Sequence, residues 1–337
     1  MANDADTRHA TLPPSEACNY QFARNLKSGP HLKQPRFDVI SEGDIFGPAR
    51  YVPDDREIEA YCYAVGCKLS EYQAPSGKTG QRLAPSCLVV KELMWLYQTG
   101  YDRARLNGLH QHEEIKFHRP VPAGTELVMT GRTTRKYVRR GKGYFVHSSE
   151  ARGHDGTLYI EQVNTEILEL PESLITGAAS AEPSGRKITG DWPDGPVAVH
   201  PSIAVPGMRI PDGLADVDRG QMAVFSGALE DYRNSHTDGS IAKSCGFPDS
   251  VAQGLMAVCW LSEFMVKWGG AAFLSGGRIS ATFLKIMLPG DKFQIKGIVS
   301  QELKDTKAIE VEVAILNQRN EITMVAFVEI PVLGTIG

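Results

Sequence analysis

The sequence predicts an α+β fold made of two similar halves, each with an antiparallel sheet around one apolar helix. The chain has 337 residues, a length that suits two domains of ordinary size. Hydrophobic residues make up 42% and charged residues 23%, which is typical of globular proteins. The third observation is an internal repeat, because strand, turn and helix patterns of the first half recur in the second.

The repeat is clearest where an apolar strand ends in a glycine turn and a second strand follows. Residues 115–131 read IKFHRPVPAGTELVMTG, and residues 281–297 read ATFLKIMLPGDKFQIKG. The two segments are offset by 166 residues, so that Phe117 aligns with Phe283. The residue types agree along both segments: each has an apolar strand, a turn with glycine and a second alternating strand. This agreement indicates a duplication.

The same offset relates two helix candidates. LVVKELMWL, starting at Leu88, aligns with GLMAVCWLS, starting at Gly254, and both segments are almost entirely apolar. We expect helices over residues 88–99 and 254–268, the second ending at the glycine pair 269–270.

Strands are predicted around each helix. They cover residues 113–119, 126–138, 143–153 and 158–170 in the first half, and 278–287, 292–302, 308–317 and 322–331 in the second. A helix that is apolar on almost every face must be covered on almost every face, and a strongly curved antiparallel sheet does this. That arrangement is the hot-dog architecture, and two copies make a double hot-dog.

A segment of different composition separates the halves. Residues 171–206 contain TGAASAEPSG and GDWPDGP, with little sustained apolar periodicity. Such a segment is typical of a linker. We therefore predict an N-terminal hot-dog domain over residues 1–170 and a C-terminal one over residues 207–337.

Charge and cysteine content limit the partners and the cellular compartment that we expect for the protein. The net charge is −4, and no apolar run approaches the length of a membrane span, so we expect no nucleic-acid or membrane partner. The first residues include two aspartates and no apolar core of a signal peptide, and none of the six cysteines forms a C-x-x-C pair. These features favour a cytoplasmic protein with reduced thiols. The oligomeric state stays open, with a homodimer as one alternative.

The segment FSGALEDYRNSHTDGSIAKSCGFPDSVAQGLM, residues 225–256, carries the candidate chemistry. Asp231 and His236 lie five residues apart among turn-forming residues. Further along, Gln253 and Gly254 precede and open the predicted second helix, where free backbone N–H groups point outward.

This segment resembles the signature of the MaoC-like (R)-specific enoyl-CoA hydratases, also called hydratase 2. The matching positions, in chain order, are Phe225-Ser226, Asp231, His236, Asp238, Ala242, Gly246-Phe247 and Ala252-Gln253-Gly254-Leu255. The likeness extends from about Asp38 onward, because the first half resembles the non-catalytic N-terminal domain of the two-domain members. It implies a lyase of acyl metabolism that interconverts a trans-2-enoyl-CoA and an (R)-3-hydroxyacyl-CoA.

Three positions depart from the family pattern. Glu230 stands where a glycine is usual, Arg233-Asn234 replaces Asn-Pro, and Gln253 replaces a histidine. The acid–base pair itself is kept.

The residue types fit the implied reaction. A carboxylate and an imidazole, here Asp231 and His236, can bracket one water, remove a proton from it and deliver a proton to the α-carbon. The N–H of Gly254 at the helix start can stabilise the charge on the thioester oxygen by roughly 3 kcal/mol. Gln253 and Arg233 are further substrate-binding candidates. No metal or redox cofactor is needed, because the thioester supplies the acidity of the α-proton; coenzyme A enters as part of the substrate, with an acyl carrier protein as the alternative carrier.

The repeat also predicts one site per chain. The offset of 166 places Val65 opposite Asp231 and Ser70 opposite His236, and neither can act as an acid or base. Leu88 stands opposite Gly254. The first half is therefore expected to serve as a wall for the acyl chain.

Other clusters suggest weaker candidates. On a regular strand, His110, His112, Glu114 and His118 would share one face, either as a metal site or, as we favour, in contact with solvent. Arg278 and Lys285 are candidates for binding the phosphates of coenzyme A.

Two alternatives to the general hydratase stay open. One is a non-catalytic acyl-thioester-binding or scaffold protein. The other is a hydratase for a branched or dicarboxylic C4–C5 acyl-CoA, which the cationic Arg233 would favour. Acyl length and the physiological direction are likewise open.

Overall fold

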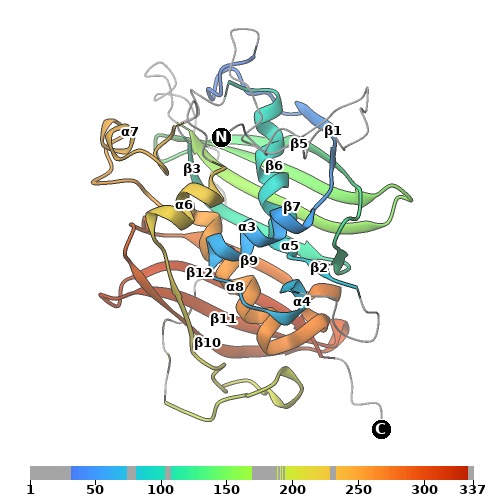
Figure 1. Ribbon diagram of the computed structural model, residues 1–337. Coiled ribbons are helices and arrows are strands. Elements are labelled where there is room, and N and C mark those ends of the chain that lie inside the picture. Colours follow the sequence, from blue (N-terminus) through green and yellow to red (C-terminus); the bar gives the residue numbers. More distant parts are fainter. Residues whose placement is uncertain are drawn as a thin grey trace.

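Ten strands form one antiparallel sheet in which the two halves of the chain join side by side (Figure 1). The computed structural model describes residues 32–73, 81–102, 108–168, 194–227 and 233–332, together with residues 188, 190 and 192. The strands of the first half are β1 (Ile45–Tyr51), β3 (Gly108–Phe117), β5 (Leu127–Arg139), β6 (Lys142–Gly153) and β7 (Leu158–Leu168). Those of the second half are β8 (Gly213–Asp216), β9 (Arg278–Phe283), β10 (Lys292–Leu303), β11 (Ala308–Asn317) and β12 (Ile322–Pro331). A separate two-stranded sheet pairs β2 (Leu83–Ala84) with β4 (Val121–Pro122).

The strand order has the symmetry that a duplication requires. It runs β1-β5-β6-β7-β3 in the first half and continues as β9-β12-β11-β10-β8 in the second. The halves meet where β3 pairs with β9, with Ile115 opposite Ile279. The ends of these two strands, Phe117 and Phe283, keep the offset of 166 residues. The predicted α+β double hot-dog is confirmed.

The two apolar helices lie in the core. Helix α5 (Ser86–Trp95) is buried at every residue and continues into the 3₁₀ turn η1 (Leu96–Thr99). Helix α8 (Gly254–Gly269) exposes only Lys267 to any large extent. The glycine signal at its end is confirmed, because Gly270 adopts a positive φ of 62° that a residue with a Cβ rarely takes.

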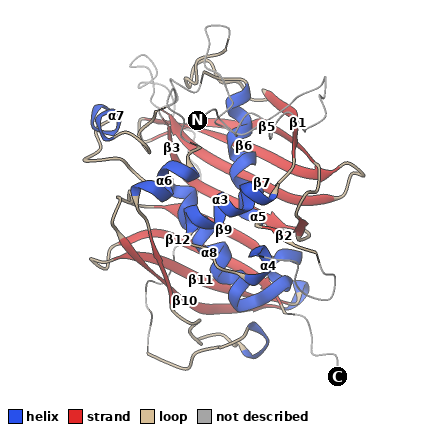
Figure 2. Cartoon of the chain, in the orientation of Figure 1, coloured by secondary structure: helices blue, strands red, loops and turns tan. Residues whose placement is uncertain are grey.

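The shorter helices α3 (Asp55–Val65), α4 (Ser70–Gln73) and α6 (Arg219–Phe225) lie with α5 and α8 on one face of the sheet (Figure 2). The other short elements are α7 (Gly239–Ser244) and the 3₁₀ turns η4 (Pro201–Ile203), η5 (Gly270–Ser275) and η6 (Lys304–Thr306). Helix α3 begins at an aspartate cap, in which Asp54 accepts a hydrogen bond from the N–H of Glu57. None of the described helices is long and apolar enough to cross a membrane.

Two strands differ from their predicted bounds by more than two residues. Strand β3 begins at Gly108, before the predicted start at 113, and a bulge interrupts its pairing between His110 and His112. Strand β9 ends at Phe283 instead of continuing to 287, because the next two N–H groups both donate to the carbonyl of Thr323. This shared acceptor ends the regular ladder beside the candidate site.

The predicted linker is described only in part, since residues 169–187 lie outside the described residues. Its last portion packs on the second half: the indole of Trp268 donates to the carbonyl of Ala198 at 2.8 Å, and Arg209 pairs with the same segment. The domain bounds themselves stay a prediction.

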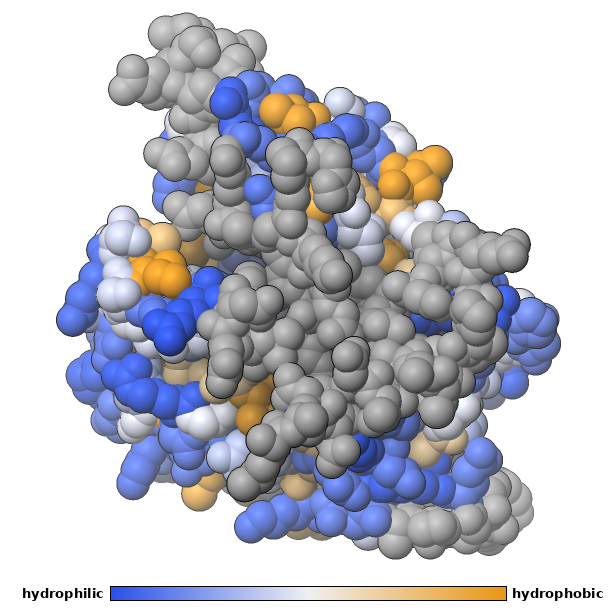
Figure 3. Space-filling model, turned by 45° about the horizontal axis from the view of Figure 1, so that its top comes forward, coloured by the Kyte–Doolittle hydropathy of each residue, from blue (hydrophilic) through white to orange (hydrophobic). Residues whose placement is uncertain are grey.

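Where Figure 3 shows described residues, the surface is mainly hydrophilic, and its apolar side chains form small, separate groups. Large exposed apolar residues such as Ile45 and Leu214 lie on opposite outer strands of the sheet, β1 and β8. Scattered exposure of this kind needs no partner to explain it.

A buried carboxyl on α8 connects the two halves. Glu263 accepts hydrogen bonds from the hydroxyl of Tyr61 at 2.9 Å and from the thiol of Cys67 at 3.3 Å, both in the first half. Burial raises the pKa of Glu263 well above its usual 4.5. The folded protein therefore retains a proton that the unfolded chain releases, and this contribution to stability declines as the pH rises above 4.5.

We therefore expect Glu263→Gln to raise the free energy of unfolding at pH 8 by on the order of 1–2 kcal/mol, because the amide oxygen can accept from Tyr61 and the amide N–H can donate to the Cys67 sulfur without an acid having to hold a proton. Thermal unfolding at pH 5 and pH 8 measures the effect, which should shrink at the lower pH. Glu302→Gln, at an exposed position on β10, is the control. An unchanged pH dependence of stability in the Glu263 variant would contradict the expectation.

Candidate active site

A cavity of about 530 Å³ lies between the two halves of the chain. The second half lines it with the segment around His236, the start of α8 and the end of β9. The first half contributes residues of α5, η1, β3 and β7. The expectation that the first half would wall the site is therefore met within the described residues.

His236 is held in one tautomer. Its Nδ1 lies 2.7 Å from the carbonyl oxygen of Val251, and because a carbonyl can only accept, Nδ1 carries the proton. Nε2 of the neutral ring is then a free base. Burial lowers the pKa of His236 below its usual 6.5, which outweighs the opposing effect of the Val251 carbonyl. The ring is therefore neutral at pH 7, as a base must be.

A tight turn positions the backbone of His236. Its N–H donates to the side-chain oxygen of Asn234 at 2.9 Å, and the N–H groups of Thr237 and Asp238 donate to the Asn234 carbonyl. Asp238 then caps α7. It accepts hydrogen bonds from the hydroxyl of Ser240 and from the N–H groups of the first turn, which together lower the pKa of this aspartate to about 2. An asparagine thus replaces the family's Asn-Pro as the turn former.

Arg233 is directed partly away from the site. Its guanidinium pairs with Asp238 at 3.3 Å, and 68% of its side chain is exposed. It lines the cavity, but it is already engaged by a carboxylate.

Gly254 is the first residue of α8 and lines the same cavity as His236. The preceding Gln253 makes no side-chain cap, so the first N–H groups of the helix keep their capacity to donate. A Cβ at Gly254 would come within 3.1 Å of the Phe283 ring. A side chain at this position would therefore crowd the Phe283 ring as well as any ligand that approaches the N–H.

Gln253 is 4% exposed and lines the cavity. Its amide nitrogen donates to the hydroxyl of Ser226 at 3.0 Å, while its oxygen accepts no hydrogen bond from a described residue. This fixes the orientation of the amide and leaves a buried acceptor beside Gly254.

The remaining predicted site residues are placed as follows. Asp231 falls at 228–232, outside the described residues, so its role stays a prediction. Lys285 lines the cavity but forms an ion pair with Glu321 at 2.7 Å. Arg278 is not among the residues that line the cavity; it faces Glu329 at 3.8 Å. Both cations are about half exposed, and their role toward coenzyme A is untested.

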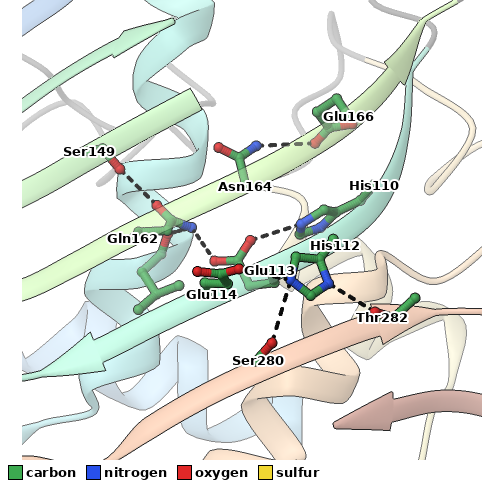
Figure 4. A network of polar contacts seen from close by, with 11 residues as sticks. His110, His112, Glu113, Glu114, Ser149, Gln162, Asn164, Glu166, Ser280 and Thr282 are labelled. Carbon is green, nitrogen blue, oxygen red and sulfur yellow. Dashed lines mark hydrogen bonds and ion pairs between the residues drawn. The ribbon is translucent and has the colours of Figure 1, made fainter. Parts of the chain in front are cut away.

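The prediction that four polar residues of β3 share one face is wrong for His110. The bulge at Gln111 shifts the alternation, so that His110 turns inward and its Nε2 lies 2.8 Å from the buried Glu113 (Figure 4). His112 and Glu114 remain on the other face, with their side chains 3.2 Å apart. No group of three or more metal-binding side chains occurs in the part of the chain that is described.

The first-half counterparts of the site have structural roles. Leu88 is buried within α5, Val65 ends α3, and Ser70 begins the one-turn helix α4, where its hydroxyl donates to Glu71. None of the three lines the cavity.

Sequence reasoning missed the polar contribution of the first half. Gln98, His110 and Glu166 all line the cavity, and Phe283 packs against His110 with the two rings tilted and their centroids 4.5 Å apart. Gln98 could have been noticed as a polar residue in an apolar helix. The inward turn of His110 depends on a bulge that residue spacing does not show.

The neutral form of His236 predicts the acid limb of the pH profile. For catalysis that needs Nε2 unprotonated, kcat/KM should be flat above pH 7 and decline only below the ordinary histidine value of 6.5, because burial lowers this pKa. A pH–rate profile from pH 5 to 9 measures it. A decline that begins above pH 7 would contradict the assignment.

Comparison with known proteins adds to this geometry. A family model of the MaoC-like domain matches residues 204–320. These residues form a MaoC-like domain. Among curated proteins, none matches the sequence of this chain. The described site at His236 and Gly254 lies within the MaoC-like domain.

Solved structures support the fold of the whole chain. A MaoC-like dehydratase is 17% identical with a TM-score of 0.67, over 87% of this chain and 98% of that one. A conserved hypothetical protein from Mycobacterium tuberculosis with a double hot-dog fold is 12% identical with a TM-score of 0.59, over 88% and 98%. A provisionally assigned oleoyl thioesterase from Lactobacillus plantarum is 9% identical with a TM-score of 0.52, over 87% and 96%. At these identities the likeness shows the fold alone, and this fold includes more than one kind of enzyme.

Proposed function

We propose that the protein is a hydro-lyase that adds water to, or removes it from, the 2,3 bond of an acyl thioester. One observation carries the proposal: His236 and Gly254 line the same cavity, within a MaoC-like domain. His236 has an unprotonated Nε2 that can act as a base, and Gly254 is the first residue of α8. A base and an N–H donor on one wall are what the addition of water to an enoyl thioester requires.

In the proposed mechanism, the thioester oxygen accepts a hydrogen bond from the N–H of Gly254. Water lies between His236 and Asp231, and its oxygen forms a bond to the β-carbon as a proton leaves it. The electron pair of the double bond passes to the thioester carbonyl as an enolate, and the α-carbon then takes up a proton from the pair. One water is consumed, and the 3-hydroxyacyl thioester is the product; the reverse sequence eliminates water. The family resemblance assigns the (R) configuration.

The test is hydration of crotonyl-CoA, followed as loss of enoyl absorbance, with trans-2-hexenoyl-CoA alongside. Chiral analysis of the product gives its configuration. Enoyl loss with formation of the 3-hydroxyacyl thioester is expected. Release of free coenzyme A thiol without hydration would instead indicate a thioesterase, in which the same base directs water to the carbonyl. Tight binding of acyl-CoA without any turnover would indicate the non-catalytic alternative.

The described contacts weaken the case for a dicarboxylic substrate. Arg233, the residue that favoured it, is paired with Asp238 and mostly exposed. The opposite wall carries the buried carboxyl side chain of Glu166, which would not attract a second carboxylate. A coenzyme A thioester stays the preferred carrier form, and the acyl carrier protein is the alternative.

A further inference from the structure

The first-half wall of the cavity contains a buried polar cluster that the proposed reaction does not use. Its members from β3 and β7 are drawn in Figure 4, and Gln98 joins them from η1. An acyl pocket for a plain alkyl chain would gain nothing from polar walls, because buried polar groups cost free energy unless they are hydrogen-bonded.

One part of the cluster is fully satisfied. His110 contacts Glu113 at 2.8 Å, the other oxygen of Glu113 accepts from Gln162 at 2.7 Å, and Gln162 accepts from Ser149 at 3.0 Å. Burial opposes a charge on His110, but the bond to Glu113 and the nearby carboxylates raise its pKa above 6.5. This chain therefore holds the imidazole in a fixed position and favours its cationic form.

The other part is left with unused acceptors. Glu166 lies opposite His110 in the β3–β7 pairing and is 6% exposed. Among the described residues, its one hydrogen bond comes from Asn164, at 3.5 Å, the limit of such a bond. The side-chain oxygens of Asn164 and Gln98, 0% and 3% exposed, accept none from described residues. Two buried acceptors therefore lack a donor among the described residues, and Glu166 has only one long bond. Of these three residues, Gln98 and Glu166 line the cavity.

The position of the cluster relates it to the acyl group. The Phe283 ring lies next to Gly254, and its centroid is 4.5 Å from that of the tilted His110 ring. One aromatic ring therefore contacts both the predicted thioester site and the polar wall. Arg233 and Lys285 also line the cavity, but at least half of each side chain is exposed and each pairs with a carboxylate, so they do not belong to the buried cluster.

We propose that Glu166 and Gln98 bind a hydroxyl group on the acyl chain, so that the substrate is a short hydroxylated enoyl thioester. This inference rests on the proposed function. A neutral donor fits best, since His110 would repel an ammonium group, and burial, which raises the pKa of Glu166 above 4.5, disfavours a second carboxylate beside it. A buried site built to accept from a hydroxyl discriminates strongly against the analogue that lacks it.

The experiment compares trans-2-hexenoyl-CoA with its 4-, 5- and 6-hydroxy derivatives in the wild type, Glu166→Leu and Gln98→Leu. We expect the wild type to favour one hydroxylated substrate by about 10- to 100-fold in kcat/KM. Glu166→Leu should abolish this preference while keeping turnover of the unsubstituted hexenoyl thioester, and Glu166→Gln, which can still accept, should keep part of it. Glu161→Gln, on β7 but outside the cavity, is the matched control and should behave as the wild type.

Several outcomes would overturn the proposal. They are equal rates for all four substrates in the wild type, a preference that survives Glu166→Leu, or better turnover of 6-amino or 6-carboxy analogues. Equal losses of kcat/KM for hydroxylated and plain substrates in Glu166→Leu would indicate that Glu166 contacts the pantetheine arm of coenzyme A instead. If no thioester is turned over, the proposed function fails, but the inference can still be tested by binding. Calorimetry would compare the affinities of 6-hydroxyhexanoyl-CoA and hexanoyl-CoA for the wild type and for Glu166→Leu.

Discussion

Replacing His236 with alanine should lower kcat for enoyl thioester hydration by about 100- to 10,000-fold, the range that general acid–base catalysis contributes. The structure gives the physical reason: the Val251 carbonyl fixes the proton on Nδ1, and burial keeps Nε2 unprotonated. Asp231→Asn should have a similar effect, because it removes a basic carboxylate while keeping size and hydrogen bonding. Steady-state kinetics with crotonyl-CoA measure both.

The double variant tests whether the two residues share one water. Groups that act as a unit are non-additive, so the double variant should be little slower than either single one. Binding of a saturated acyl-CoA, measured by calorimetry, should survive in all three. Ser70→Ala, at the first-half position that matches His236, is the control and should leave the rate nearly unchanged. Additive losses would argue against a shared water, and full activity in either single variant would remove the assignment.

Much of the fold follows from patterns that are local in the sequence. Strands β11 and β12 have their predicted bounds, 308–317 and 322–331, because alternating apolar residues stop at a clear turn where Asn320 adopts a positive φ. The end of α8 was visible as a glycine pair. The repeat then predicts the first half from the second, since one offset relates all the major strands.

The candidate site was only partly predictable. His236 and Gly254 belong to one continuous segment, whose turn and helix signals are local. The opposite wall is not local: it is formed where η1, β3 and β7 of the first half meet the second half. The inward position of His110 results from a single bulge residue, Gln111, which changes which side chains face the core. Residue alternation cannot reveal such an irregularity.

The asymmetry between the halves has a structural consequence. Duplication provides two equivalent helix starts, but Leu88 is buried in α5 where Gly254 opens α8 onto the cavity. The first half lost the helix-start site and gained polar wall residues instead. One catalytic half and one recognition half would then share a single cavity.

The helix start gives the second large expected effect. Gly254→Ala should lower kcat/KM by about 100-fold, because the added Cβ would lie 3.1 Å from the Phe283 ring and force the ring or the first turn of α8 to move. The movement itself would be a few tenths of an ångström. The added methyl group would also stand where the thioester oxygen approaches the N–H, and the loss of one such donor costs about 100-fold or more in rate. Kinetics with crotonyl-CoA measure the loss, and thermal unfolding shows whether the variant is folded.

Gly269→Ala supplies the matched control at the other end of the same helix. A Cβ there would be similarly crowded, 3.3 Å from Ile330, but it lies away from the cavity. We expect both variants to lose comparable stability and only Gly254→Ala to lose activity. Equal activity losses in the two would mean that strain in α8 lowers the rate, and an unchanged rate in Gly254→Ala would remove the helix start from the mechanism. A selective loss at Gly254 would support a site in which His236 supplies the base and the first turn of α8 holds the thioester oxygen.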